Sequence, residues 1–199
     1  MEAMELPEAA GCKVATVKGM DSLKELNVYT LIPKWTIPPV TKIIGSKRVC
    51  KRKADSTYKA RIVAQGWNLV PGIDCGGVSS PVYRLQSIGM VLAIAADLNW
   101  EVLQLDVRTA FLKADIERDV YVAEAPGFET TGECPQAMKL LKSLYGPPDS
   151  PMNWWNTIDP YLVQIRFEPL NSDTCVYAYT AKKGMVAVVT LNVDDLLLL

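Results

Sequence analysis

The chain has 199 residues, of which 49% are hydrophobic and 22% are charged, with a formal net charge of −1. These values are typical of a globular chain that buries its core in one domain, or in a domain with an added lobe. The sequence contains no histidine, which excludes Ser-His-Asp catalysis, Cys-His catalysis and histidine metal ligands. Any catalysis must therefore use carboxylates, lysines, tyrosines or metals, and composition leaves a carboxylate metal site most open.

The cysteines are odd in number and none have Cys-x-x-Cys spacing: Cys12, Cys50, Cys75, Cys134 and Cys175. This pattern is typical of reduced thiols in an intracellular protein and argues against a disulfide framework or a zinc site. No apolar run approaches the ~18 residues of a membrane span. The acidic start also lacks the basic and then apolar order of a secretory signal. We therefore expect an intracellular chain with no membrane partner.

In the N-terminal part of the chain, the sequence predicts only a short helix and an extended connection before a β-hairpin. Residues 1–19 show weak periodicity and are expected to be poorly ordered, and residues 21–27 are expected to form a short helix. Residues 30–41 contain three prolines, which indicates an extended connection. Two strands, at 46–53 and 58–66, are expected to form a hairpin.

Basic residues are concentrated around this hairpin. Residues 42–61 contain eight basic residues and one acidic residue, a net charge of +7 that leaves −8 for the rest of the chain. A basic lobe beside an acidic body suits a phosphate-rich ligand next to a metal-binding cluster. A solvated basic hairpin without a ligand explains the pattern equally well.

The middle of the chain combines loops with a helix and a strand. Residues 68–82 are rich in Gly and Pro and are expected to be a loop. Apolar residues at helical spacing predict a helix at 84–98 that leads into a strand ending at Asp106. Residues 113–137 are loop-like, with a short strand at 120–122.

The C-terminal part predicts a helix followed by strands. The helix is expected at 151–165, although Pro160 should kink or cut it. Strands are expected at 174–180, at 185–191 and from 196 onward. The order of elements predicts an α+β sheet with helices on one face.

Two adjacent carboxylates, Asp194 and Asp195, lie between two apolar runs and follow Asn192 at a predicted hairpin turn. Adjacent like charges with apolar flanks are usually compensated by a divalent cation. The alternative is a hairpin whose polar turn is simply solvated. Asp106, at the end of another strand, favours the first interpretation, because carboxylates on two elements can bridge two metal ions in a phosphoryl-transfer site.

Six segments form a motif series whose order and spacing together are specific for one protein family: Tyr58–Gly66, Ser80–Leu85, Leu105–Leu112, Val120–Val122 with Pro126–Phe128, Leu141–Gly146 and Val193–Leu197. From about residue 20 to its end, the chain resembles the reverse transcriptase domain of copia-type LTR retrotransposons, within Gag-Pol polyproteins. The resemblance implies a right-hand polymerase fold. Fingers would lie at 20–82 and the palm at 83–199, truncated after the Asp-Asp turn, with the thumb absent.

The resemblance also implies an RNA-directed DNA polymerase that adds deoxynucleotides to a primer 3′-hydroxyl, with Mg²⁺ or Mn²⁺ as cofactor. Asp106, Asp194 and Asp195 would be catalytic metal ligands, joined by the backbone carbonyl of Val107. The implied nucleotide-binding residues are Lys59 and Arg61 at the triphosphate, Val107, Phe111 under the sugar, and Tyr145 and Gly146 lining the pocket.

The implied partners are an RNA/DNA template-primer, deoxynucleoside triphosphates and the remaining Gag-Pol segments, including thumb and RNase H. The implied location is a cytoplasmic virus-like particle with a nuclear phase, and the implied process includes DNA integration. Each nucleotide-binding residue also has a simpler role: Phe111 as core, Lys59 and Arg61 as hairpin solvation, and Tyr145–Gly146 as a turn.

Some positions depart from the family pattern. Asn192 replaces a Tyr, Met152 replaces an Arg, and Pro147–Ser150 replaces Leu-Lys-Gln-Ala. These departures favour a second hypothesis, in which the chain is a catalytically inactive nucleic-acid-binding or assembly remnant with the same fold. A third hypothesis is another two-metal phosphotransferase or cyclase on a similar sheet.

Overall fold

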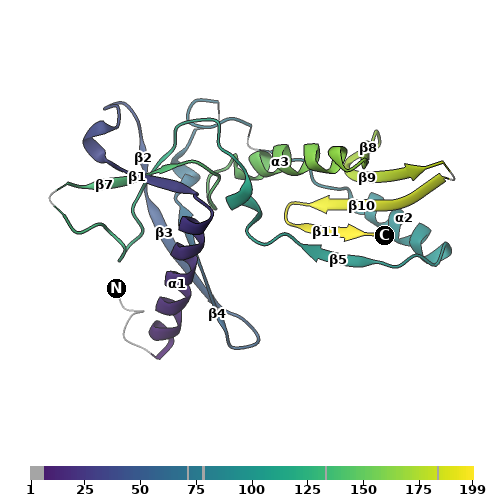
Figure 1. Ribbon diagram of the computed structural model, residues 1–199, viewed down its shortest axis with the longest axis horizontal. Helices are drawn as coiled ribbons and strands as arrows, with labels where there is room; N and C mark the ends of the chain where they lie inside the picture. The colour runs from purple at the N-terminus through teal and green to yellow at the C-terminus, as the bar shows by residue number, and fades with distance from the viewer. Residues whose placement is uncertain (1–6, 71, 78, 133, 183) are drawn as a thin grey trace.

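The computed structural model describes residues 7–70, 72–77, 79–132, 134–182 and 184–199. Within these residues the chain is a mixture of helices and sheets, with three α-helices and three separate β-sheets (Figure 1). The helices are α1 (Pro7–Glu25), α2 (Leu85–Asp97) and α3 (Ser150–Gln164). No helix in this described part is both long and apolar enough to cross a membrane.

The predicted basic hairpin is confirmed. Strands β3 (Ser46–Arg52) and β4 (Tyr58–Ala64) pair antiparallel along their whole length. Their turn is closed by the Asp55 carboxylate, which accepts hydrogen bonds from the Thr57 N–H at 2.9 Å and the Thr57 hydroxyl at 2.6 Å. Such a side-chain to backbone bond two residues along is the usual way in which Asp stabilises a turn.

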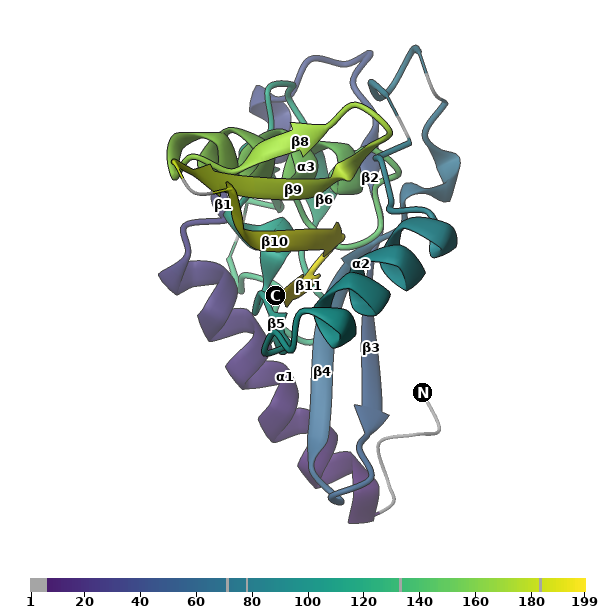
Figure 2. The same ribbon diagram turned by 90° about the vertical axis from the view of Figure 1, so that its right-hand side faces the viewer.

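The first helix corrects two expectations about the N-terminus. Residues 7–19, expected to be poorly ordered, belong to α1, which continues through most of the short helix expected at 21–27 and ends at Glu25; residues 1–6 lie outside the described part. Helix α1 runs alongside β4 (Figure 2) and buries Met20 and Leu23 in the main core. Tertiary packing therefore overrides the weak helical signal of a segment that contains two glycines.

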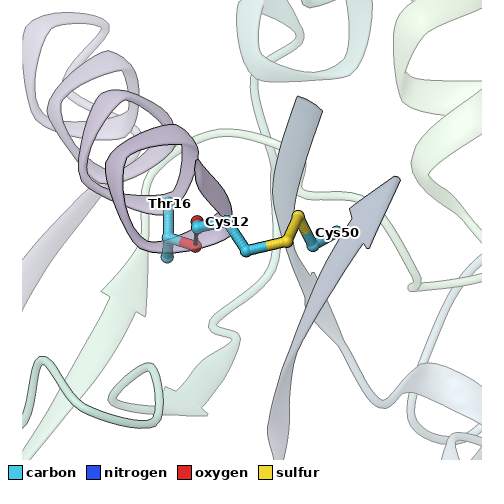
Figure 3. Close-up of a disulfide and its surroundings, with 3 residues drawn as sticks. All are labelled: Cys12, Thr16 and Cys50. Carbon is cyan, nitrogen blue, oxygen red and sulfur yellow. Dashed lines mark hydrogen bonds between the residues drawn. A yellow bond between two sulfur atoms is a disulfide. The ribbon is translucent and has the colours of Figure 1, made fainter. Parts of the chain in front are cut away.

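The expectation of five reduced thiols is wrong for two of the cysteines. Cys12 on α1 and Cys50 on β3 form a disulfide, with their Cα atoms 6.0 Å apart (Figure 3). The other three cysteines are free, and Cys134 is exposed whereas Cys75 and Cys175 are buried. Burial raises the pKa of the Cys175 thiol to about 11, so this group is a poor nucleophile.

The main core joins the hairpin to a second sheet. That sheet has the order β1-β7-β6-β2, formed by Tyr29–Pro33, Gln136–Leu140, Tyr121–Ala123 and Ile43–Ile44. Its buried residues pack with those of α1 and β4 in one cluster that includes Val28, Ile44, Ile62, Val122, Met138 and Leu144. Strand β6 confirms the short strand expected near 120–122.

The C-terminal half forms a five-stranded sheet with the order β5-β11-β10-β9-β8. These strands are Leu103–Asp106, Asp195–Leu198, Gly184–Asn192, Asp173–Ala181 and Glu168–Leu170. All of their pairings are antiparallel. The strands that were predicted at 174–180, at 185–191 and from 196 onward are therefore confirmed.

The helices do not cover one face of this sheet, as was expected, but both faces. Trp154 of α3 clusters with Val189 and Leu196, whereas Ala95 of α2 clusters with Val188 and Leu199. Because successive strand residues point to opposite faces, α2 and α3 pack on opposite sides of the sheet. Hydrophobic residues on both sides of β10 explain the near-continuous apolar run at its end.

Helix α3 continues through Pro160 and is not cut there. Trp154, Ile158 and Leu162 are buried at a spacing of four residues and anchor one stripe of the helix on the sheet. Pro160 is exposed, and so is Asn156, whose carbonyl loses its helical partner, so this carbonyl lies on the side of the helix that solvent can reach.

The disulfide yields the first testable prediction. Opening the loop closed by Cys12–Cys50, a sequence separation of 38, should lower the free energy of unfolding by about 3–4 kcal/mol in the chain-entropy description. Denaturant unfolding of Cys12→Ser, compared with the oxidised protein, measures this loss. Cys134→Ser is the matched control and should leave stability unchanged. The prediction would be contradicted if the protein were equally stable before and after a thiol reductant opens the disulfide.

Candidate active site

The turn between β10 and β11 brings three carboxylates to one corner of the sheet. Asn192 pairs with Asp195 across a tight turn formed by Val193 and Asp194. Strand β11 lies between β10 and β5, so Asp195 is the direct antiparallel partner of Asp106. The Val107 N–H donates a 2.8 Å hydrogen bond to the Asp194 carbonyl and extends this pairing past the strand end.

Asp106 and Asp195 therefore face each other across neighbouring strands. Directly opposite residues have Cα atoms about 4.5–5.5 Å apart and side chains on the same face. Like charges in such a pair destabilise a sheet. Both residues are exposed, and neither forms an ion pair with a residue in the described ranges. A bound cation is one way in which opposed carboxylates are compensated in proteins.

The carboxylates do not all point into the same space. Asp106 and Asp194 line a cavity of about 310 Å³, whereas Asp195 lines a neighbouring one of about 300 Å³ with Gln104 and Asn192. In the part of the chain that the structure describes, no three Asp, Glu, Cys or His side chains lie close enough together to hold a metal ion.

The larger cavity lies between the hairpin, α1 and the carboxylate corner. Consecutive residues 58–62 line it, so it runs along the edge of β4 that β3 does not occupy. Of the predicted nucleotide-binding residues, Lys59, Arg61, Val107 and Tyr145 line this cavity, but Phe111 and Gly146 are not among its described lining residues. Its volume is at the lower end of the range usual for small-molecule sites.

Tyr145 connects the cations of the hairpin with the carboxylates. The Arg61 guanidinium lies 4.9 Å from the centre of the Tyr145 ring, a cation–π contact, and Phe111 packs edge-on with ring centres 5.2 Å apart. Burial raises the pKa of the Tyr145 phenol; Arg61 opposes this rise, and Asp194 and Asp106 add to it. The phenol therefore stays protonated and can act as a hydrogen-bond donor in the cavity.

Gly146 explains how Tyr145 reaches this position. The Tyr145 carbonyl accepts a 2.8 Å hydrogen bond from the Ala64 N–H, which joins this loop to the end of β4. Gly146 has a φ of 113°, and a Cβ atom there would lie 1.9 Å from the Ala64 carbonyl oxygen. Only glycine fits this close approach. The Tyr145–Gly146 segment is therefore a docking point between two parts of the chain as well as a turn.

Backbone conformation marks the corner in a way that the sequence did not reveal. Val193 and Thr109, both β-branched, have positive φ values of 55° and 58° and flank the carboxylates from two sides. This conformation is unusual for β-branched residues and costs about 1–3 kcal/mol at each position. The Trp154 indole N–H donates a 2.6 Å hydrogen bond to the Val193 carbonyl and holds the turn. This hydrogen bond is not apparent from the sequence.

The departures from the family pattern before α3 have a structural explanation. Asp149 is buried and accepts two hydrogen bonds from Arg118, from Nε at 2.8 Å and from Nη2 at 3.1 Å. The buried Ser150 hydroxyl donates to the Leu144 carbonyl at 2.7 Å. Both polar side chains of this segment therefore have a partner within the chain, as buried polar groups require.

Replacing Gly146 with alanine tests the docking point. We expect Gly146→Ala to lower the free energy of unfolding by about 3 kcal/mol or more, because a positive φ is combined with a steric clash. Gly127→Ala is the control: Gly127 has a φ of 83° but nothing within 4 Å of its would-be Cβ, so about 1–2 kcal/mol is expected. Chemical denaturation measures both, and equal losses would contradict this account of Gly146.

The hold on the hairpin turn gives another prediction. Trp154→Phe keeps a large ring but leaves the Val193 carbonyl without its donor, which should cost about 1–3 kcal/mol of stability. Tyr161→Phe, on the exposed side of the same helix, should change stability by less than about 0.5 kcal/mol. Unfolding curves of the two variants check this. A Trp154→Phe variant as stable as Tyr161→Phe would show that the turn does not depend on the indole.

Comparisons with known proteins identify relatives of this chain. The sequence profile of the family described as "Reverse transcriptase (RNA-dependent DNA polymerase)" matches residues 26–199. The chain is 35% identical over 99% of its length to the retrovirus-related Pol polyprotein from transposon TNT 1-94 of Nicotiana tabacum. It is 36% identical over 81% of its length to the Pol polyprotein from transposon RE1 of Arabidopsis thaliana.

A more distant relative comes from yeast. The chain is 34% identical over 79% of its length to the Transposon Ty1-BL Gag-Pol polyprotein of Saccharomyces cerevisiae. The matched region covers 15%, 11% and 8% of the tobacco, Arabidopsis and yeast relatives, respectively. The chain thus spans a small part of each polyprotein. On these matches, the chain belongs to the reverse transcriptase family found in the Pol polyproteins of copia-type retrotransposons.

Proposed function

We propose that the corner formed by Asp106, Asp194 and Asp195 is the catalytic centre of an RNA-directed DNA polymerase. The observation that carries this proposal is the strand register, which makes Asp195 the direct partner of Asp106 and bonds Val107 to Asp194. A sheet gains nothing from two opposed carboxylates unless a cation joins them. The reaction is the addition of a deoxynucleotide to a primer 3′-hydroxyl.

The chemical type of the donor atoms at this corner suits a divalent metal ion, although the three carboxylates are not gathered into one cluster. Reverse transcriptases generally use divalent metals, and carboxylate and carbonyl oxygens are the ligands that Mg²⁺ and Mn²⁺ prefer. Asp106, Asp194, Asp195 and the Val107 carbonyl would hold the ions. When bound, they would lower the pKa of the attacking hydroxyl and stabilise negative charge on the phosphates.

The other residues of the cavity would bind and orient the nucleotide. Lys59 and Arg61 supply positive charge for the triphosphate from β4. Tyr145 would present its hydroxyl and ring to the deoxyribose, with Phe111 supporting the ring edge-on. Gly146 keeps the backbone close to β4 so that Tyr145 stays beside Arg61. Such positioning lowers the entropic part of the barrier.

In this proposal, residues 20–82 act as fingers and residues 83–199 as a palm. The basic hairpin would contact the phosphates of a template-primer. Thumb and RNase H segments elsewhere in a Gag-Pol polyprotein would complete the enzyme, in a cytoplasmic virus-like particle with a nuclear phase. The matched region covers no more than 15% of these relatives, so the other parts of the enzyme would come from the rest of such a polyprotein.

A second function is favoured by specific observations. The three carboxylates do not converge on one cavity, and Asn192 stands where the family has Tyr. With the basic hairpin intact, a catalytically inactive nucleic-acid-binding or assembly remnant would show the same fold. Such a remnant would bind oligonucleotides but would not incorporate deoxynucleotides.

The variant Asp106→Asn separates these functions. In a primer-extension assay with Mg²⁺, we expect incorporation by the wild-type chain and a loss of at least about 100-fold in the variant. Without metal, the variant should be more stable by about 0.2–1 kcal/mol, because like-charge repulsion is relieved. Calorimetric melting should show that Mg²⁺ stabilises the wild type and not the variant.

Glu101→Gln is the matched control for these measurements. Glu101 is an exposed carboxylate just before β5, and its removal should leave both incorporation and the Mg²⁺ response intact. If Asp106→Asn kept the wild-type Mg²⁺ response, the metal site would lie elsewhere. Oligonucleotide binding without any incorporation by the wild type would favour the inactive remnant.

A further inference from the structure

Helix α1 supplies a whole wall of the candidate nucleotide cavity. The lining residues of α1 recur three and four positions apart: Ala15, Lys18, Gly19, Ser22 and Leu23. They therefore form one stripe along the helix. Lys18 is the charged member of this stripe. The helix contains two other lysines, Lys13 and Lys24. Because successive residues are rotated by about 100° around the helix axis, both project from the side opposite this stripe.

The position of this wall is fixed by close packing. A Cβ atom on Gly11 would lie 2.4 Å from the Tyr58 ring, and one on Gly19 would lie 3.3 Å from the Ala60 carbonyl oxygen. The helix backbone therefore lies directly on β4 (Figure 2). The disulfide of Cys12 to Cys50 adds a covalent link to the hairpin (Figure 3). Lys18 is consequently presented to the cavity by a well-anchored element.

The charges around the cavity are unbalanced. Two carboxylates line it, those of Asp106 and Asp194. Four cationic side chains also line it: Lys18, Lys59, Arg61 and Arg108. Lys18 is exposed and forms no ion pair with any residue that the structure describes. A concave site with surplus positive charge concentrates anions. The carboxylates at one end suit a metal-bound anion, as a polyphosphate is.

We propose that Lys18 is a polyphosphate-binding residue of this site. Its ammonium group contacts the phosphate chain of the incoming deoxynucleoside triphosphate from the α1 side of β4. Arg61 contacts the same chain from the other face of the strand, where it packs over Tyr145. The inference rests on the proposed function, because it concerns the substrate of that same cavity.

A nucleotide fits this cavity better than the phosphate backbone of a template does. The cavity has a volume of about 310 Å³ and is lined by α1, β4 and the loop after β5. A small ligand can enter such a space, whereas a nucleic-acid strand needs a continuous groove with phosphate contacts along it. Both ligands share phosphate chemistry, so the experiment must distinguish them.

The test compares Lys18→Ala with Lys13→Ala in the full 199-residue chain. Binding of inorganic tripolyphosphate, of a deoxynucleoside triphosphate with Mg²⁺, and of a single-stranded oligonucleotide is measured by titration calorimetry. We expect Lys18→Ala to weaken the first two by roughly 5- to 20-fold and Lys13→Ala to leave them unchanged. Lys18→Arg should restore most of the affinity. In primer extension, the KM for the nucleotide should rise in Lys18→Ala while kcat changes little.

Several results would overturn the assignment. These are an unchanged triphosphate affinity in Lys18→Ala, an equal loss in Lys13→Ala, weakening of oligonucleotide binding alone, or no tripolyphosphate binding by the wild type. The proposed function is tested separately. If Asp106→Asn abolishes extension while Lys18→Ala keeps the wild-type KM, only the role of Lys18 fails. If the wild type extends no primer but binds tripolyphosphate through Lys18, the polymerase function fails and the binding site stands.

Discussion

The opposition of Asp106 and Asp195 across β5 and β11 is the constraint on which the rest of the structure depends. Strand β11 has only four residues, yet it lies inside the sheet and pairs with both neighbours. The position of β11 between its two neighbours fixes the carboxylates relative to each other and brings the Val107 N–H into hydrogen-bonding distance of the Asp194 carbonyl. Helices α2 and α3 then cover the two faces of the sheet and bury the apolar sides of β10 and β11. Burial of apolar side chains on the central strands thus stabilises the sheet, and this stabilisation offsets the repulsion between two carboxylates at one end.

Among the described residues, the two β-branched ones with a positive φ lie at the same corner. Val193 and Thr109 adopt a left-handed conformation that β-branched residues avoid. Val193 directly precedes Asp194 and Asp195, and Thr109 follows Asp106 by three residues. The hydrogen bond from Trp154 and the packing of α3 offset this cost at the turn. Strain that persists in a folded protein is often found where a ligand is bound or chemistry occurs. The conformations and the charges therefore point to one place independently of any comparison with relatives.

The local elements were predictable from the sequence, whereas their meeting in space was not. The β3–β4 hairpin, α2 and the strands of the C-terminal sheet follow from hydrophobic periodicity and turn residues, which act over short distances. The part of α1 before residue 20 was missed because Gly11 and Gly19 weaken the helical signal and serve contacts with β4 that are distant in sequence. The pairing of Cys12 with Cys50 and the opposite faces of α2 and α3 also depend on three-dimensional packing. The positions of Asp106 and Asp195 at strand ends were predictable, but the hydrogen bond of Trp154 and the position of Lys18 in the cavity wall were not.

A crystal structure of the chain grown with Mn²⁺ would show whether the opposed carboxylates form a divalent metal site. Anomalous scattering locates manganese without any assumption about the ligands. We expect a manganese ion within about 2.0–2.2 Å of a carboxylate oxygen of Asp106 and of one from Asp194 or Asp195. Saturating Mn²⁺ with no anomalous peak at this corner, or with a peak bound only elsewhere, would contradict it.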